Sequence, residues 1–116
     1  MDDEAKNIYL SLPPLERATR FQFLLTQGTT SSQIARGLGK SLAYVSNSLR
    51  LLRLPPIIQE GLISNTISEG HARSLLGLRN EQQMVAVYKE IIVNGLSVRQ
   101  AEEQVRKLMA FKPVSV

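Results

Sequence analysis

The chain has 116 residues, a formal net charge of +4 at pH 7, one histidine and no cysteine. Without cysteine it forms no disulfide and offers no thiolate to a metal ion or a substrate, which is typical of proteins kept in a reducing compartment. No apolar run approaches the roughly 20 residues of a membrane-spanning helix, and the acidic opening Met1-Asp2-Asp3-Glu4 is unlike the basic start of a secretory signal. The sequence therefore predicts a cytoplasmic protein with a single domain over residues 1–116.

The basic residues are concentrated in one part of the chain. Between Arg17 and Gln59 there are six basic residues and no acidic one: Arg17, Arg20, Arg36, Lys40, Arg50 and Arg53. A segment of one sign produces a directed field that attracts polyanions. Chance unevenness on a polar surface is the alternative explanation, unless a motif coincides with the segment.

The pattern of apolar residues is helical along the chain, and no stretch alternates for long enough to indicate a strand. A first helix follows Ser11, begins with Pro13 and Pro14, and ends at Gly28. Thr30 or Ser31 caps a second helix that continues to Leu38, and Ser41 caps a third that runs to about Arg53.

Four more helices are expected over residues 56–65, 68–76, 81–94 and 97–109. In the last of them, Val98, Ala101, Val105 and Leu108 recur at helical spacing and are expected to face a core. The sequence therefore predicts an all-α fold, a compact multi-helix bundle of about seven helices.

A helix-turn-helix is predicted at about residues 31–52, SSQIARGLGKSLAYVSNSLRLL. The motif needs a small residue where the two helices meet, a glycine at a left-handed turn, and a branched apolar residue that locks the second helix onto the first. Ala35, Gly39 and Val45 supply these at spacings of four and six residues.

The second helix of this motif has two different sides at about 100° per residue. Leu42, Val45, Leu49 and Leu52 fall on the side that is expected to pack inward. The opposite side carries Ala43, Ser46, Asn47 and Arg50. Small side chains there permit close approach to a groove, and the amide and guanidinium can hydrogen-bond base edges or phosphates. Tyr44 lies at the flank, where its phenol either reaches a phosphate or lies over the rim of the core.

Two short helices joined by a glycine turn also occur in proteins that never bind nucleic acid. Here the motif coincides with the acid-free segment, and the two independent features favour DNA binding.

The sequence continues as GKSLAYVSNSLRLLRLPPIIQEGLISNTISEGHARSLLGL. This string is similar to the central DNA-binding domain of the ParB/RepB/Spo0J family of plasmid and chromosome partition proteins, which includes KorB-type repressors and nucleoid-occlusion proteins. The stretches LPPLERATRFQFLL and GLSVRQAEEQVRKL resemble the family's flanking helices, so the resemblance covers nearly the whole chain. It implies an all-helical fold and sequence-specific binding of double-stranded DNA at a centromere-like, parS-type inverted repeat. The helix at about residues 41–52 would lie in the major groove.

The resemblance also implies a role for a second stretch, ISEGHARSLL. Ser68 would cap a helix whose first turn presents bare amides and the positive end of the helix dipole to a phosphate. The absence of a side chain at Gly70 would let the phosphate approach, and Arg73 would add a charge-assisted contact. Two alternatives stay open: a structural His71 that caps or packs, and an ion pair of Arg73 with Glu69.

The predicted DNA-binding residues are Ser31, Gln33, Lys40, Ser41, Leu42, Ala43, Tyr44, Ser46, Asn47, Arg50, Gly70, His71 and Arg73. Family members often have a basic residue where this chain has Leu42, which either touches a thymine methyl or completes the core. We therefore expect the recognised DNA sequence to differ.

No catalytic, cofactor-binding or metal-binding residue is predicted, and the chain is not expected to be an enzyme. His71 has no second histidine or cysteine with which to bind a metal ion, and the serines lack a base. Family members usually carry an N-terminal CTP-binding domain and a C-terminal dimerisation domain. Neither is found in this sequence, so we expect no CTP binding by the chain itself. We also expect the chain to be a fragment excised from a longer protein, with a small stand-alone regulator as the alternative.

The expected partner is double-stranded DNA, bound by one chain per half-site or by a weak homodimer on the inverted repeat. A partition ATPase would be recruited only through the missing regions, and the location would be the nucleoid or a plasmid. A KorB-like repressor or a nucleoid-occlusion factor shares the fold and is the alternative within this class. A protein-interaction module without DNA binding is the alternative from another class, and it would have no reason to keep the face around Ala43, Asn47 and Arg50 free of acid.

Overall fold

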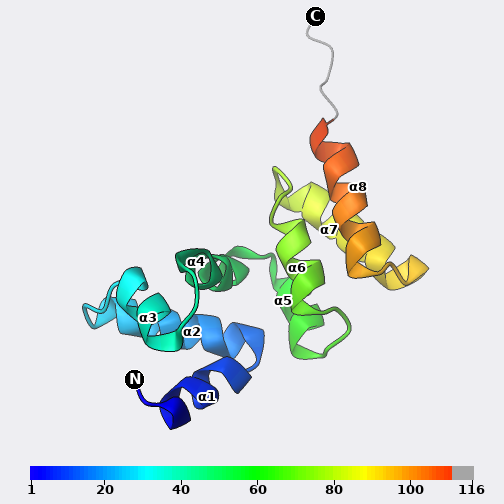
Figure 1. Ribbon diagram of the computed structural model, residues 1–116. Coiled ribbons are helices and arrows are strands. Elements are labelled where there is room, and N and C mark those ends of the chain that lie inside the picture. The colour runs from blue at the N-terminus through cyan, green and yellow to red at the C-terminus, as the bar shows by residue number, and fades with distance from the viewer. Residues whose placement is uncertain (111–116) are drawn as a thin grey trace, which may run out of the picture. The chain divides into compact units, whose positions relative to one another are not determined.

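A computed structural model describes residues 1–110 as helices joined by short turns (Figure 1). The chain divides into two compact units, Met1–Arg53 and Leu54–Val116. The predicted all-α class is confirmed, because the described residues form eight α-helices and one 3₁₀ helix and no strand. The prediction of a single domain over residues 1–116 stays a prediction.

The first unit contains four α-helices and the 3₁₀ helix. They are α1 (Asp3–Ser11), α2 (Pro14–Thr26), α3 (Ser31–Leu38), α4 (Leu42–Arg50) and η1 (Leu51–Arg53). The three helices expected here are all present. The α-helical part of the third ends at Arg50, and the chain tightens into η1 before Leu54-Pro55. Such tightening is common in the last turn of a helix, and a residue that precedes proline avoids the α conformation.

Helix α1 was not predicted from the sequence. Its N-terminus is capped by Asp2, whose Oδ1 accepts a hydrogen bond from the N–H of Ala5 at 2.8 Å. Asp3 and Glu4 in the first turn interact favourably with the positive end of the helix dipole. No residue of α1 is fully buried. The capping aspartate and the acidic first turn were the available signals.

The core of the first unit is built around the fully buried Phe21 of α2. The other buried members of this cluster are Ile34, Ala35 and Leu38 of α3 and Val45 of α4. Tyr9 of α1 stacks on Phe21 with 6.2 Å between ring centroids. The core therefore fixes α3 and α4 against α2, and α1 packs on the same cluster.

The second unit consists of four helices that the sequence predicted. They are α5 (Pro56–Ile63), α6 (Glu69–Leu75), α7 (Glu81–Asn94) and α8 (Val98–Ala110). Helix α6 packs along α8, and the apolar stripe predicted for α8 is confirmed: Ala101 and Val105 are buried, and Val98 and Leu108 are half-buried. Helices α5 and α7 meet where Tyr88 lies against Gly61.

Among residues 1–110, no helix is both long enough and apolar enough to cross a membrane. The same residues contain no group of three or more histidine, cysteine or acidic side chains that could hold a metal ion.

Candidate nucleic-acid interface

The helix-turn-helix begins with a capping box at α3. The Oγ1 of Thr30 accepts a hydrogen bond from the N–H of Gln33 at 3.1 Å, and the N–H of Thr30 donates to Oε1 of Gln33 at 2.8 Å. Thr30 is therefore the cap, which decides between the two residues that the sequence left open, and Ser31 is the first helical residue. The side chain of Gln33, a predicted DNA-binding residue, is held at the helix N-terminus by this box.

The turn between α3 and α4 has the geometry that the sequence predicted. Gly39 adopts a left-handed conformation with φ of 66°, and Ala35 and Val45 are buried on the two sides of the turn. Ser41 caps α4, because its Oγ accepts a hydrogen bond from the N–H of Tyr44 at 3.1 Å. Ala35, Gly39 and Val45, together with the cap, therefore set the orientation of α4 against α3.

Three of the four side chains predicted on the outward side of α4 are exposed. Ala43, Ser46 and Arg50 are exposed, and Asn47 is half-buried. These side chains form the α4 face, defined as Ala43, Ser46, Asn47 and Arg50. It includes small side chains, an amide and a guanidinium, and it contains no acidic residue.

The prediction that Leu42 packs inward with the other apolar residues of α4 is wrong. It is 52% exposed, whereas Val45 is fully buried and Leu49 and Leu52 are half-buried. Leu42 is the first residue of α4, and the next residue on its side of the helix, Val45, is the first to be buried. Core packing is therefore excluded for Leu42, and the contact with a thymine methyl stays a prediction.

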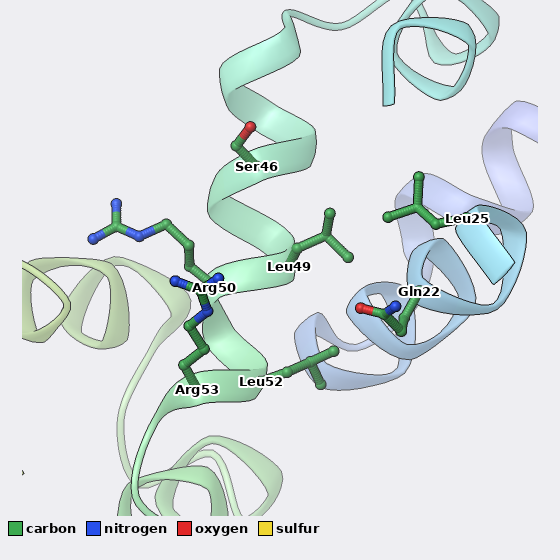
Figure 2. Close-up of a pocket in the computed structure, with 7 residues that line it drawn as sticks. All are labelled: Gln22, Leu25, Ser46, Leu49, Arg50, Leu52 and Arg53. Atoms are coloured by element: carbon green, nitrogen blue, oxygen red, sulfur yellow. The ribbon is translucent and has the colours of Figure 1, made fainter. Parts of the chain in front are cut away.

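A shallow cavity of about 500 Å³ lies between α2 and the end of α4 (Figure 2). Its lining residues are Gln22, Leu25, Ser46, Leu49, Arg50, Leu52 and Arg53. In Figure 2, Leu25 and Gln22 of α2 face Leu49, and Arg50 extends from α4 on the side away from α2. The exposed side chain of Arg50 therefore points away from the core of the first unit, and its contact with DNA stays a prediction.

The interpretation of Arg17 as one of the surface cations of the acid-free segment is wrong. Its side chain is only 4% exposed, and its Nε–H donates to the Oγ of Ser48 at 3.3 Å. The guanidinium carbon lies 5.2 Å from the centroid of the Tyr44 ring. Arg17 therefore holds α2 to α4 and adds no outward cation. The other five basic residues of the segment are exposed: Arg20, Arg36, Lys40, Arg50 and Arg53.

Tyr44 is half-buried and lies near two cations. Besides Arg17, the Nζ of Lys40 lies 5.4 Å from its ring centroid, and the ring meets Phe21 edge-on at 6.4 Å. These contacts place the ring over the rim of the core, which was one of the two roles left open for it. A cation near the face of a tyrosine ring is attracted by its quadrupole, so Lys40 is held beside the N-terminus of α4.

The second predicted stretch lies in the second unit, at the start of α6. Ser68 caps this helix as predicted, because its Oγ accepts a hydrogen bond from the N–H of His71 at 3.3 Å. The Nδ1 of His71 accepts in return from the N–H of Ser68 at 3.1 Å, and Nε2 lies 2.8 Å from the carbonyl oxygen of Leu96. With its proton on Nε2, the ring satisfies both partners. This is the structural role that the sequence left open for His71.

Gly70 has a packing role that sequence reasoning missed. A Cβ atom at this position would lie 3.0 and 3.1 Å from the two Cγ atoms of Val98 on α8. Real Cβ contacts are rarely this short, so the missing side chain lets α6 and α8 approach. The prediction attributed the glycine to the approach of a phosphate, but the side from which the Cβ is missing faces α8. A contact between DNA and Gly70 stays a prediction, and the close approach of α8 is a separate reason for a glycine at this position.

Arg73 is exposed on α6. The alternative for this residue was an ion pair with Glu69, and no such pair forms in the part of the chain that the structure describes. Its guanidinium is therefore available to an anion.

Comparison with known proteins identifies similar sequences. The family model described as ParB HTH domain matches residues 11–110. A nucleoid occlusion protein of Listeria monocytogenes serotype 4b is 40% identical over 102 residues, which cover 87% of this chain and 36% of that protein. The chromosome-partitioning protein Spo0J of Thermus thermophilus is 46% identical over 102 residues, which cover 88% of this chain and 37% of that protein. The chain thus spans little more than a third of the length of these curated relatives.

Two solved structures resemble the chain. One is the crystal structure of the DNA-binding domain of the chromosome-partitioning protein ParB complexed to the centromeric parS site. It has a TM-score of 0.79 and 36% identity, and the match covers 91% of this chain and 86% of that one. The other is the C-terminally truncated ParB from Caulobacter crescentus, also complexed to parS, with a TM-score of 0.75 and 39% identity over 84% of this chain and 51% of that one.

Proposed function

The chain belongs to the ParB helix-turn-helix domain family, and we propose that it binds double-stranded DNA sequence-specifically at a centromere-like, parS-type inverted repeat. The observation that carries this proposal is the α4 face, which is free of acid and exposed at three of its four residues. It is presented by a helix-turn-helix with two capped helices and a left-handed glycine in the turn. Two similar solved domains are complexed to parS, and this supports the choice of DNA site.

In the proposed complex, α4 lies in the major groove. Ala43 and Ser46 are small enough to let the helix backbone approach the bases, and Asn47 and Arg50 hydrogen-bond base edges or phosphates. Leu42, at the exposed start of the helix, packs on a thymine methyl.

The residues around the helix N-termini position the protein on the DNA backbone. Lys40 and the hydroxyls of Ser41 and Ser31 are proposed to contact phosphates, as does Gln33 through the part of its amide that the capping box leaves free. Tyr44, with its ring over the core rim, contributes its phenol at the edge of this surface.

The start of α6 is proposed to add backbone contacts. Arg73 is its main contributor, because its guanidinium is exposed and a guanidinium matches the geometry of a phosphate. Gly70 and His71 support this contact through the backbone amides of the first turn, while their packing and hydrogen bonds hold α6 in place.

The biological role that we propose is plasmid or chromosome partition. A KorB-like repressor or a nucleoid-occlusion factor is the second candidate, and it is favoured by the similarity to the nucleoid occlusion protein of Listeria monocytogenes. No catalytic activity and no cofactor are assigned to residues 1–116. The proposed location is the nucleoid or a plasmid. The chain would bind there as one copy per half-site or as a weak homodimer. Recruitment of a partition ATPase would require regions outside this chain.

The proposal is tested by titrating the purified chain against two fluorescent duplexes. One carries a parS-type inverted repeat, the other carries the same bases scrambled, and each is titrated at about 50 and about 200 mM salt. We expect a preference for the inverted repeat that persists at the higher salt, because hydrogen bonds to bases are less sensitive to counterions than contacts with phosphates.

Two results would contradict the proposal. Equal binding to both duplexes that vanishes at the higher salt would indicate a surface that reads only the DNA backbone. No binding at the lower salt would favour the protein-interaction module instead.

A further inference from the structure

Helix α1 lies almost entirely outside the family match, which begins at residue 11, yet it packs against the helix-turn-helix. The side chain of Met1 lies 3.6 Å from the point that a Cβ atom on Gly37 of α3 would occupy. Tyr9 stacks on Phe21, and Tyr9 and Leu10 pack on the core cluster of the unit. These contacts fix the register of α1 against α3.

This register brings Lys6 to the turn of the motif. Its Nζ lies 3.5 Å, and its Cε 4.0 Å, from the point that a Cβ atom on Gly39 would occupy. Gly39 is the exposed, left-handed residue of the turn, and the next two residues are Lys40 and the helix cap Ser41. Lys6 is half-buried, so its aliphatic stem packs while its ammonium group reaches this surface.

The ammonium group of Lys6 is not neutralised by the acids of its own helix. Asp2 uses its carboxylate to cap α1, and within residues 1–110 no ion pair joins Lys6 to Asp2, Asp3 or Glu4. The partial negative charge at the C-terminus of α3 favours a cation at this place, which accounts for the position of Lys6 in the free protein. Its charge is therefore available to an additional anion.

We propose that Lys6 is a DNA-contacting residue that binds a backbone phosphate beside the N-terminus of α4. This inference rests on the proposed function. The N-terminal end of a recognition helix is the part that meets the groove, and the residues around it contact the flanking phosphates. Lys6 and Lys40 place ammonium groups on the two segments that meet at the turn, one from α1 and one from the motif itself. Sequence reasoning missed Lys6 because it lies outside both the motif and the acid-free segment.

The test uses the full chain, the inverted-repeat duplex and the scrambled duplex, titrated over a series of salt concentrations. The variants are Lys6→Gln, which removes the charge, and Lys6→Arg, which keeps it. The control is Lys89→Gln, which removes an exposed cation from α7 in the second unit. Thermal unfolding of each variant separates a loss of stability from a loss of contact.

For Lys6→Gln we expect the slope of log affinity against log salt to become shallower by about 0.9, and affinity at 0.1 M salt to fall by about 3- to 10-fold on both duplexes alike. The equal effect is expected because a phosphate contact carries no base information. Lys6→Arg and Lys89→Gln should keep the slope of the unaltered chain.

An unchanged slope in a folded Lys6→Gln variant would overturn the inference and leave the proposed function intact, provided that the unaltered chain prefers the inverted repeat. A loss of slope in Lys89→Gln equal to that in Lys6→Gln would overturn it as well, because the effect would then come from net charge. Absence of binding by the unaltered chain would overturn both the inference and the proposed function.

Discussion

The Nε–H of Arg17 on α2 donates a hydrogen bond to the Oγ of Ser48 on α4 across 3.3 Å, inside the first unit. Ser48 in turn donates to the carbonyl oxygen of Tyr44 at 2.9 Å, one helical turn earlier. The buried guanidinium therefore holds α4 through a hydroxyl and lies over the ring of Tyr44. Arg17, which the sequence pattern placed among the surface cations, instead fixes the orientation of α4 and of its α4 face against α2.

We expect Arg17→Ala to lower the free energy of unfolding by about 2 kcal/mol or more, because it removes a buried hydrogen bond and leaves the packing around Tyr44 incomplete. The measurement is urea unfolding. Arg20→Ala is the matched control on the same helix, and because Arg20 is exposed its effect should stay within about 0.5 kcal/mol. Equal effects of the two substitutions would contradict a structural role for Arg17.

Gly61→Ala should destabilise the second unit by about 1–3 kcal/mol through overpacking. A Cβ atom at Gly61 would lie 2.6 Å from the hydroxyl oxygen and 2.8 Å from Cε1 of the buried Tyr88, so the tyrosine side chain or the two helices would have to shift. Gly37→Ala in α3 is the matched control. Its Cβ would meet only Met1, at 3.6 Å, and alanine favours the helix by about 0.5–1 kcal/mol. Thermal unfolding should show opposite signs, and a neutral Gly61→Ala would contradict the close packing.

Gly70→Ala distinguishes the packing role of this glycine from the role in phosphate approach. We expect a loss of about 1–2 kcal/mol in unfolding free energy, because the new methyl group would press on Val98. Combining it with Val98→Ala should recover part of this loss, since the smaller partner leaves space for the methyl group. An unchanged unfolding curve together with lost DNA affinity would contradict the packing explanation and support the original one.

His71→Ala should cost about 1–2 kcal/mol of stability, because it removes both the reciprocal half of the capping box and the hydrogen bond to Leu96. Since both ring nitrogens already have partners within the second unit, we expect the salt dependence of DNA affinity to stay as it is in the unaltered chain. Urea unfolding and duplex titration of the same variant check the two statements. A shallower salt slope with unchanged stability would instead indicate a direct contact between His71 and DNA.

Arg50→Ala and Arg73→Ala should each weaken DNA binding without preventing folding. If the guanidinium contacts a base, the loss is about 1–3 kcal/mol on the inverted repeat and smaller on the scrambled duplex. If it contacts a phosphate, the salt slope falls by about 1 on both duplexes. Lys107→Ala is the control, because Lys107 is exposed on α8 and paired with Glu103. Loss of folding in either arginine variant would make that arginine structural.

Much of the fold follows from local rules that the sequence exposes. Proline at the start of α2, the caps at Ser41 and Ser68, and the left-handed Gly39 are decided by backbone sterics and hydrogen bonds within a few residues, so their positions are predictable. The α4 face is predictable for the same reason, because 3.6 residues per turn places Ala43, Ser46 and Arg50 on the side away from the apolar stripe of the buried Val45.

The amino-acid sequence by itself thus determined the all-α class, the helix-turn-helix and the acid-free face of α4. Only the tertiary structure decided that Arg17 is buried, that Gly70 is a contact with α8, and that Lys6 reaches the turn at Gly39. Each of these depends on two segments that are distant in the chain but adjacent in space. The periodicity of a helix shows which of its sides is apolar. Which other segment covers that side depends on packing across the whole unit.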